Sequence, residues 1–282
     1  MWLPARGVLC TGDLFLWVCP NAGNPQKVQR YALDWAVALR TMASLDSEVL
    51  CPGHGVPIWG RDRVHRALTE TAELLEQLHD QTLAMMNEGA RLDDILHAVK
   101  APAHLIERPY LQPLYDEPEF IVRNVHRLYG GWWDGNPANL QPASAPALAR
   151  ELAALAGGAG KLADRASELA ARGEHALACH LAELAGEAAP RDAGVWRARG
   201  SVYAARAQAA RSLMAKGVYR SAASEKGRSQ RARRPRTARR RAGRSVGSRA
   251  RSPAPARSVV RSPAGPPAAS MGSRACQGPP SA

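Results

Sequence analysis

The chain has 282 residues and a formal net charge of +13, but the charge is unevenly spread. Residues 224–282 hold 15 Lys and Arg and a single acid, whereas residues 1–223 carry 23 basic and 24 acidic residues, a net charge of −1. The part of the chain that can build a core is therefore nearly neutral, and the basic charge that would suggest nucleic-acid binding lies only in the tail.

The cysteines and the N-terminus further restrict the kind of protein that the sequence can encode. The five cysteines form no CxxC pair and are odd in number, which argues against a zinc knuckle or a disulfide framework and favours free thiols in a reducing compartment. The apolar N-terminus is interrupted by Asp13, and no small-residue cleavage site follows it. No apolar run is long enough to cross a bilayer. We therefore expect a cytoplasmic protein without a signal peptide or a membrane span.

The first 90 residues alternate between strand and helix patterns. Strands are expected at 7–10 and 14–18, a helix near 26–44, a strand with a turn at 47–55, and a long helix over 60–89. The first helix is predicted from apolar residues at helical spacing, namely Val28, Tyr31, Trp35, Leu39 and Met42. Gly89 stands where a helix C-terminus favours glycine. This alternation predicts an α/β arrangement.

From residue 92 onward the pattern is helical. Helices are expected at 92–99, 119–133, 145–157, 160–172, 174–187 and 192–216, with a proline-rich connection before the second of them. The later helix pairs have roughly the length of a tetratricopeptide repeat, and about one and a half such units are present.

Beyond Ala223 the composition changes abruptly to Arg, Pro, Ser, Ala and Gly. Such a segment has too few large apolar residues to form a core, so we expect residues 224–282 to be a disordered basic tail. One interpretation is an arm that binds RNA, DNA or an acidic partner. The alternative is a tail that is inert or translated out of frame, because GC-rich codons give this composition and no aromatic residue is interleaved for base stacking.

Two side chains have the character of metal ligands. Asp13 is placed in the predicted turn between two strands, and His54 stands on a turn between Gly53 and Gly55. A carboxylate and an imidazole at strand ends are suitable oxygen and nitrogen ligands for zinc. The spacing alone is also met by ordinary turn residues, so it leaves both interpretations open.

Four motifs occur in a fixed order along the chain: "CTGDLF" at 10–15, "CPGHGVPIWGRDRV" at 51–64, "LHDQTLAMMNEG" at 78–89 and "VHRLYGGWWDGNPANL" at 125–140. Together with "SLMAKGVYRSAA" at 212–223 they resemble the alkyl sulfatases of the metallo-β-lactamase fold. The resemblance implies an α/β fragment of that fold over 1–60, an all-α, tetratricopeptide-like dimerisation domain over 61–223, and then the basic tail over 224–282.

The resemblance also implies a function. In that family two zinc ions activate a water molecule that hydrolyses an alkyl sulfate ester. Asp13 matches a late carboxylate ligand and His54 the last histidine ligand, while Arg30 and Tyr115 match positions that hold the sulfate group. Two other interpretations remain open: Arg30 as a solvated charge on the helix predicted at 26–44, and Tyr115 as a residue packed among prolines.

The sequence also departs from the family pattern. No His-x-His-x-Asp-His run is present, so most of the ligands are missing and the sequence is expected to be N-terminally truncated. Phe120-Ile121 stands where the family often has His-Asn, which leaves the substrate open. The second hypothesis is therefore a non-catalytic module that forms a homodimer through its helices.

Overall fold

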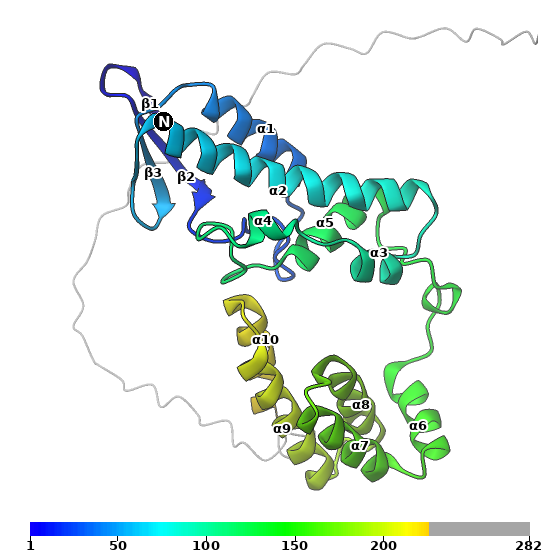
Figure 1. Ribbon diagram of the computed structural model, residues 1–282. Coiled ribbons are helices and arrows are strands. Elements are labelled where there is room, and N and C mark those ends of the chain that lie inside the picture. The colour runs from blue at the N-terminus through cyan, green and yellow to red at the C-terminus, as the bar shows by residue number, and fades with distance from the viewer. Residues whose placement is uncertain (226–282) are drawn as a thin grey trace, which may run out of the picture. The chain divides into compact units, whose positions relative to one another are not determined.

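The computed structural model describes residues 1–225, and the expected tail from residue 226 onward lies outside the described residues (Figure 1). A small sheet opens the fold, with the strand order β1-β2-β3-β4. The strands are β1 (Trp2–Leu3), β2 (Val8–Leu16), β3 (Val49–His54) and β4 (Ile58–Trp59). A single-turn 3-10 helix, Pro4–Arg6, joins the first two. Because β2 and β3 are parallel, their carboxyl ends lie at one edge of the sheet.

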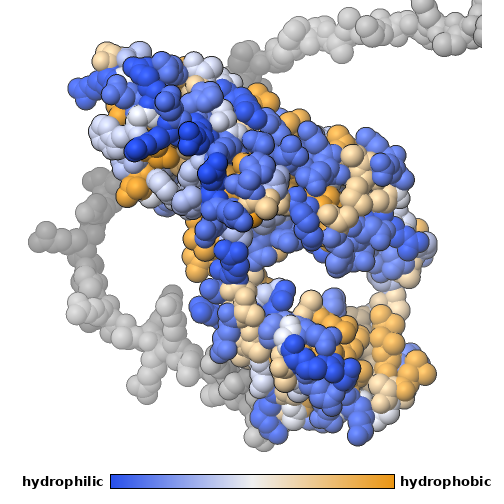
Figure 2. All heavy atoms as spheres, viewed as in Figure 1, coloured by the Kyte–Doolittle hydropathy of each residue, from blue (hydrophilic) through white to orange (hydrophobic). Residues whose placement is uncertain are grey.

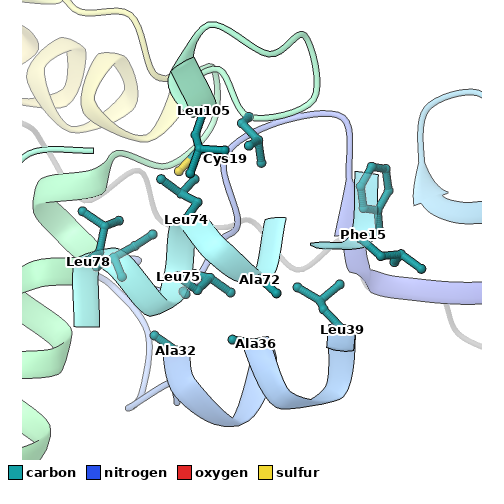
Figure 3. Packing of buried hydrophobic residues seen from close by; sticks show 14 of the residues in the cluster. Phe15, Cys19, Ala32, Ala36, Leu39, Ala72, Leu74, Leu75, Leu78 and Leu105 are labelled. Atoms are coloured by element: carbon teal, nitrogen blue, oxygen red, sulfur yellow. The ribbon is translucent and has the colours of Figure 1, made fainter. Parts of the chain in front are cut away.

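Two long helices cover one face of this sheet. Helix α1 (Ala32–Ala43) crosses from β2 to β3, and α2 (Arg61–Asn87) follows β4. Figure 3 shows small side chains of α1, Ala32 and Ala36, directed toward Leu75 and Ala72 of α2. The small residues let the two helices approach closely, and burial of each leucine contributes roughly 1.5–3 kcal/mol.

The next helices pack on α2. They are α3 (Leu92–Ala98), α4 (Ala103–Ile106) and α5 (Pro118–Gly130). One hydrophobic core runs without a break from Leu9 in β2 to Val125 in α5, so the sheet and these helices share a single interior. The side chains of Leu68, Leu74 and Leu78 are fully buried in it.

After a one-turn 3-10 helix at Pro137–Asn139, five helices complete the described part of the chain. They are α6 (Ala145–Leu155), α7 (Ala159–Ala171), α8 (His175–Ala188), α9 (Ala193–Ala209) and α10 (Leu213–Ser224). Consecutive helices from α7 to α10 pack against each other around two small clusters rich in alanine. No helix within residues 1–225 is long and apolar enough to cross a membrane.

Three predicted elements differ from the structure. The strands expected at 7–10 and 14–18 are one strand, β2, so Asp13 lies within a strand and not in a turn between two strands. The helix expected near 26–44 begins only at Ala32, and Val28 is 84% exposed. The helix expected over 192–216 is divided into α9 and α10 at an extended Ala210.

Local hydrogen bonds explain the second and third differences. The Asn24 side chain accepts the N–H of Gln26, which makes a turn where a helix would begin, and the Asn124 amide donates to the carbonyl of Arg30. At the third site, the buried Ser212 hydroxyl accepts the N–H of Ala215 and so caps a new helix.

Candidate functional site

The site lies where β2 and β3 leave their regular pairing. Cys10 pairs with Cys51 and Gly12 with Pro52, but the next partners are Leu16 and His54. Strand β2 therefore uses six residues where β3 uses three, and the extra residues form a bulge. Bulges of this kind redirect side chains, and here the bulge contains Asp13. The Oδ1 atom of Asp13 comes to lie 3.6 Å from Nε2 of His54.

The two glycines beside His54 make room for this arrangement. A Cβ atom on Gly53 would lie 2.3 Å from Oδ1 of Asp13, closer than such atoms approach. A Cβ atom on Gly55 would lie 2.1 Å from Cδ1 of Trp17, and the φ angle of Gly55, +102°, is one that favours glycine. The close approach of Gly12 and Asp13 in β2, and of Trp17 directly after it, therefore favours glycine on both sides of His54.

Two tryptophans hold the bulge from either side. Nε1 of Trp17 donates to the carbonyl of Val56 at 2.8 Å, which ties the end of β2 to the turn after His54. Nε1 of Trp35 in α1 donates to the carbonyl of Leu14 at 2.7 Å. Each hydrogen bond gives a partner to a backbone carbonyl that the irregular strand pairing does not provide with one.

The Asp13 and His54 side chains are open to solvent, with exposed fractions of 77% and 78%. Solvent screens an exposed pair at this separation, so the pair adds little to folding stability. Both side chains are therefore accessible, and a carboxylate and an imidazole are groups that zinc accepts as ligands.

A cavity of about 440 Å³ adjoins this pair and brings in Tyr115. Asp13, His54 and Tyr115, three of the four site residues predicted from the sequence, line it together. Its remaining lining is mainly apolar and comes from segments far apart in the sequence: Leu16, Trp17, Val18, Leu114 and Leu213, with Asn21 and Gly55. The sequence analysis did not identify any of these as lining residues.

Arg30, the fourth predicted residue, lies behind the wall of this cavity. It precedes α1, so its interpretation as a solvated charge on that helix is wrong. Its Nη1 donates to the carbonyl of Asn21 at 2.6 Å, and Asn21 lines the cavity. Arg30 is half-buried; burial raises the pKa of the nearby Asp116 carboxyl, and the positive charge of Arg30 opposes part of that rise.

Asp116 is a residue that the sequence analysis missed. Its side chain is fully buried, with Oδ2 accepting the N–H of Gly23 and Oδ1 the N–H of Glu117, each at 3.0 Å. Burial raises the pKa of Asp116 to about 6, against the effect of these two bonds. Asp116 thereby links the loop after β2 to the segment that carries Tyr115. The sequence feature that could have identified Asp116 is its position directly after Tyr115.

The start of α10 holds the same segment from the other side. The N–H of Leu213 donates to the carbonyl of Leu114 at 2.8 Å, and that of Met214 donates to the carbonyl of Tyr115 at 3.2 Å. These are N–H groups of a first helical turn, which have no partner within their helix. The Ser212 hydroxyl also bonds a carboxylate oxygen of Glu117. The backbone at Tyr115 is thus fixed by residues almost 100 positions later in the chain.

The ligand chemistry of the site fits zinc, but the number of ligands is small. A zinc site uses three or four protein ligands drawn from Cys, His, Asp and Glu. Within residues 1–225 no group of three or more such side chains is placed to hold a metal ion. Asp13 and His54 can therefore supply two ligands, and any further protein ligands would come from outside the described residues.

Comparison with known proteins finds that the chain is similar to alkylsulfatases. The family described as "Alkyl sulfatase dimerisation" matches residues 91–228. A linear primary-alkylsulfatase of Pseudomonas sp. is 35% identical over 188 residues, covering 66% of this chain and 36% of that enzyme. An alkyl/aryl-sulfatase of Saccharomyces cerevisiae is 31% identical over 137 residues, covering 49% of this chain and 21% of that protein. The chain thus spans about a third or less of the length of these relatives.

Solved structures of another alkylsulfatase also match the chain. The stereoselective inverting sec-alkylsulfatase Pisa1 from Pseudomonas sp. aligns with a TM-score of 0.73 and 25% identity, and a double mutant of PisA1 aligns with 0.72 and 26%. Each match covers 79% of this chain and 36% of the other. The small sheet followed by many helices is therefore the architecture of part of an alkylsulfatase. The chain is homologous to the Pseudomonas alkylsulfatases, and its residues 91–228 match the alkyl sulfatase dimerisation family.

Proposed function

We propose that this chain supplies part of the active site of a zinc-dependent alkyl sulfatase of the metallo-β-lactamase fold. The observation that carries the proposal is the cavity in which Asp13, His54 and Tyr115 meet an apolar wall. A sulfate ester of an alkyl alcohol has a charged head and an apolar tail, and this cavity offers polar side chains and apolar lining side by side. Homology to alkylsulfatases supports the same substrate class.

Different residues of the chain would bind the metal, bind the sulfate group and exclude water. Asp13 and His54 would hold the metal, since their Oδ1 and Nε2 atoms lie 3.6 Å apart at the open edge of the sheet. Zinc, when bound, would make a water molecule more acidic and offset negative charge on the ester. Tyr115 would donate a hydrogen bond from its hydroxyl to a sulfate oxygen, and Arg30 would contribute positive charge from behind Asn21. Leu114, Trp17 and Leu213 would exclude water from the alkyl chain.

Sulfate release from a linear long-chain alkyl sulfate, measured together with bound zinc, tests this proposal. The full chain is expected to bind zinc through Asp13 and His54, and this binding, with any sulfate release that accompanies it, should be lost in His54→Ala. A matched control is His97→Ala, because His97 is equally exposed, at 79%, and lies in α3 away from the cavity. Zinc binding that is unaffected by His54→Ala, or a full chain that binds no zinc, would contradict the proposal.

A second candidate function is self-association through the helical part of the chain. The family match over 91–228 carries the description of a dimerisation domain, which suggests a homodimer. In Figure 2 hydrophobic surface gathers over α6. Leu148 and Leu155, two helical turns apart on that helix, are 52% and 85% exposed. Exposed leucines on one face of a helix are typical of a surface that another chain covers.

Sedimentation of the full chain tests this second function. We expect a dimer, and a monomer after Leu148→Glu with Leu155→Glu. Leu177→Glu is a useful control, because Leu177 is 50% exposed but lies on α8. A full chain that sediments as a monomer at all concentrations would exclude self-association, whereas loss of the dimer in the control as well would place the contact elsewhere.

A further inference from the structure

Cys10 and Cys51 face each other across two parallel strands. They are direct partners in the register of β2 and β3, so their side chains emerge on the same face of the sheet. Their neighbours Leu9 and Leu50 are buried in the core on the helix-covered face, which places both cysteines on the opposite face. Both thiols are free, and both residues are half-buried and not sealed in the core.

The separation suits a covalent bond. Paired strands lie about 4.8 Å apart, which falls within the range of about 4.4–6.8 Å between Cα atoms that disulfides span. The two thiols already interact, since burial and then the neighbouring Cys10 sulfur raise the pKa of the Cys51 thiol. A disulfide would therefore require little movement of the backbone.

The position of this pair gives such a bond a structural consequence. Cys10 and Cys51 form the last regularly paired position before β2 begins the bulge that contains Asp13. His54 follows Cys51 by three residues, as Asp13 follows Cys10. A covalent link here would fix the two strands at the base of the Asp13–His54 site.

We propose that Cys10 and Cys51 are a modification site that forms a reversible disulfide with low-molecular-weight disulfides such as oxidised glutathione. One thiol loses its proton and attacks a sulfur of oxidised glutathione, which releases one glutathione thiolate and leaves a mixed disulfide. The second thiol loses its proton and attacks the protein sulfur of that mixed disulfide, expelling the second glutathione. The two cysteines lose two electrons and two protons, and oxidised glutathione becomes two reduced molecules.

The other described cysteines have no such partner. Cys19 is fully buried, and burial followed by the nearby Asp116 charge raises the pKa of its thiol well above the usual value. Cys179 is a half-buried residue of α8. Both residues are free cysteines, as are Cys10 and Cys51, so they serve as internal references for selective oxidation. Cys276 lies outside the described residues.

The experiment is oxidation of the full chain with oxidised glutathione at a mildly alkaline pH, followed by blocking of free thiols, digestion with trypsin and mass spectrometry. Cleavage after Arg and Lys gives one peptide over 7–27, with Cys10 and Cys19, and one over 41–61, with Cys51. We expect these two peptides to be joined, with fragmentation placing the bond at Cys10, and dithiothreitol to separate them again.

Two variants assign the bond. Cys19→Ser should retain the joined peptides in full, and Cys10→Ala should abolish them while Cys51 becomes singly glutathionylated. The proposal is overturned if, after oxidation of the wild-type chain, Cys10 and Cys51 both carry the blocking group, which marks thiols that stayed free. It is also overturned if each cysteine carries glutathione and no bond joins the two peptides. It is equally overturned if the link persists in Cys10→Ala. None of these outcomes depends on hydrolysis of a sulfate ester.

Discussion

Replacement of Gly53 by alanine tests whether the bulge in β2 positions the site. The added Cβ would lie 2.3 Å from Oδ1 of Asp13 and 2.7 Å from the carbonyl carbon of Gly12. The first contact could be relieved by rotation of the exposed Asp13 side chain, but the second is with backbone. Relief of both contacts therefore requires β2 and β3 to separate where they carry Asp13 and His54.

The size of the effect follows from this overlap. Real Cβ contacts are essentially never shorter than 3.0 Å, so the backbone of Gly12 must shift by a few tenths of an ångström and the carboxylate by more. Overpacking of this kind reduces the free energy of unfolding by roughly 1–3 kcal/mol. Displacement of a site group by about 1 Å can reduce activity on the order of 100-fold, so zinc affinity and any hydrolysis should fall together with stability.

Urea unfolding and calorimetric zinc titration of Gly53→Ala measure both effects. The control is Gly160→Ala, because Gly160 lies in the first turn of α7 and a Cβ there meets no atom within 4 Å. Alanine in a helix is favoured over glycine by roughly 1 kcal/mol or less, so this control should be neutral or slightly stabilising. If Gly53→Ala behaves like the control in both measurements, the reasoning about the bulge is refuted.

Two further predictions concern stability. Because burial raises the pKa of Asp116 to about 6, the folded chain keeps a proton that the unfolded chain loses near pH 4. The free energy of unfolding should therefore fall by about 2–3 kcal/mol as pH rises from 4 to 6. Urea unfolding of Asp116→Asn should not show this pH-dependent fall. An identical pH profile in the variant and the wild-type chain contradicts the prediction. Leu68→Ala should lower the free energy of unfolding by about 2–5 kcal/mol, since Leu68 is fully buried. Val28→Ala, at a residue 84% exposed, should change it by less than about 0.5 kcal/mol, and equal losses in the two variants would contradict the core assignment.

Long periodic segments were predictable from the sequence. The helix expected over 60–89 is α2, because Val64, Leu68, Leu75 and Leu78 repeat at helical spacing and all four are buried. Periodicity failed where local side-chain bonds compete with it. Val28 and Tyr31 fit the helical line, yet both are exposed, because turn and amide hydrogen bonds hold the backbone before α1.

The site was predictable only as separate residues. Gly53, His54 and Gly55 are adjacent in the sequence, so the turn could be recognised, but the bulge that places Asp13 beside His54 arises from unequal strand lengths between two paired positions. The contact of Leu213 with the cavity joins residues about 100 positions apart and depends on helix packing. Neither leaves a periodic signal in one sequence.

The placement of the metal site at Asp13 and His54 is tested most directly by nuclear magnetic resonance of the imidazole groups during a zinc titration of the full chain. The sequence has eight histidines, which report separately. The account predicts that the ring signals of His54 shift or broaden first, and that this change is lost in Asp13→Ala while the other seven histidines are unaffected. A titration in which His54 does not respond, or in which another histidine responds first, would contradict the account.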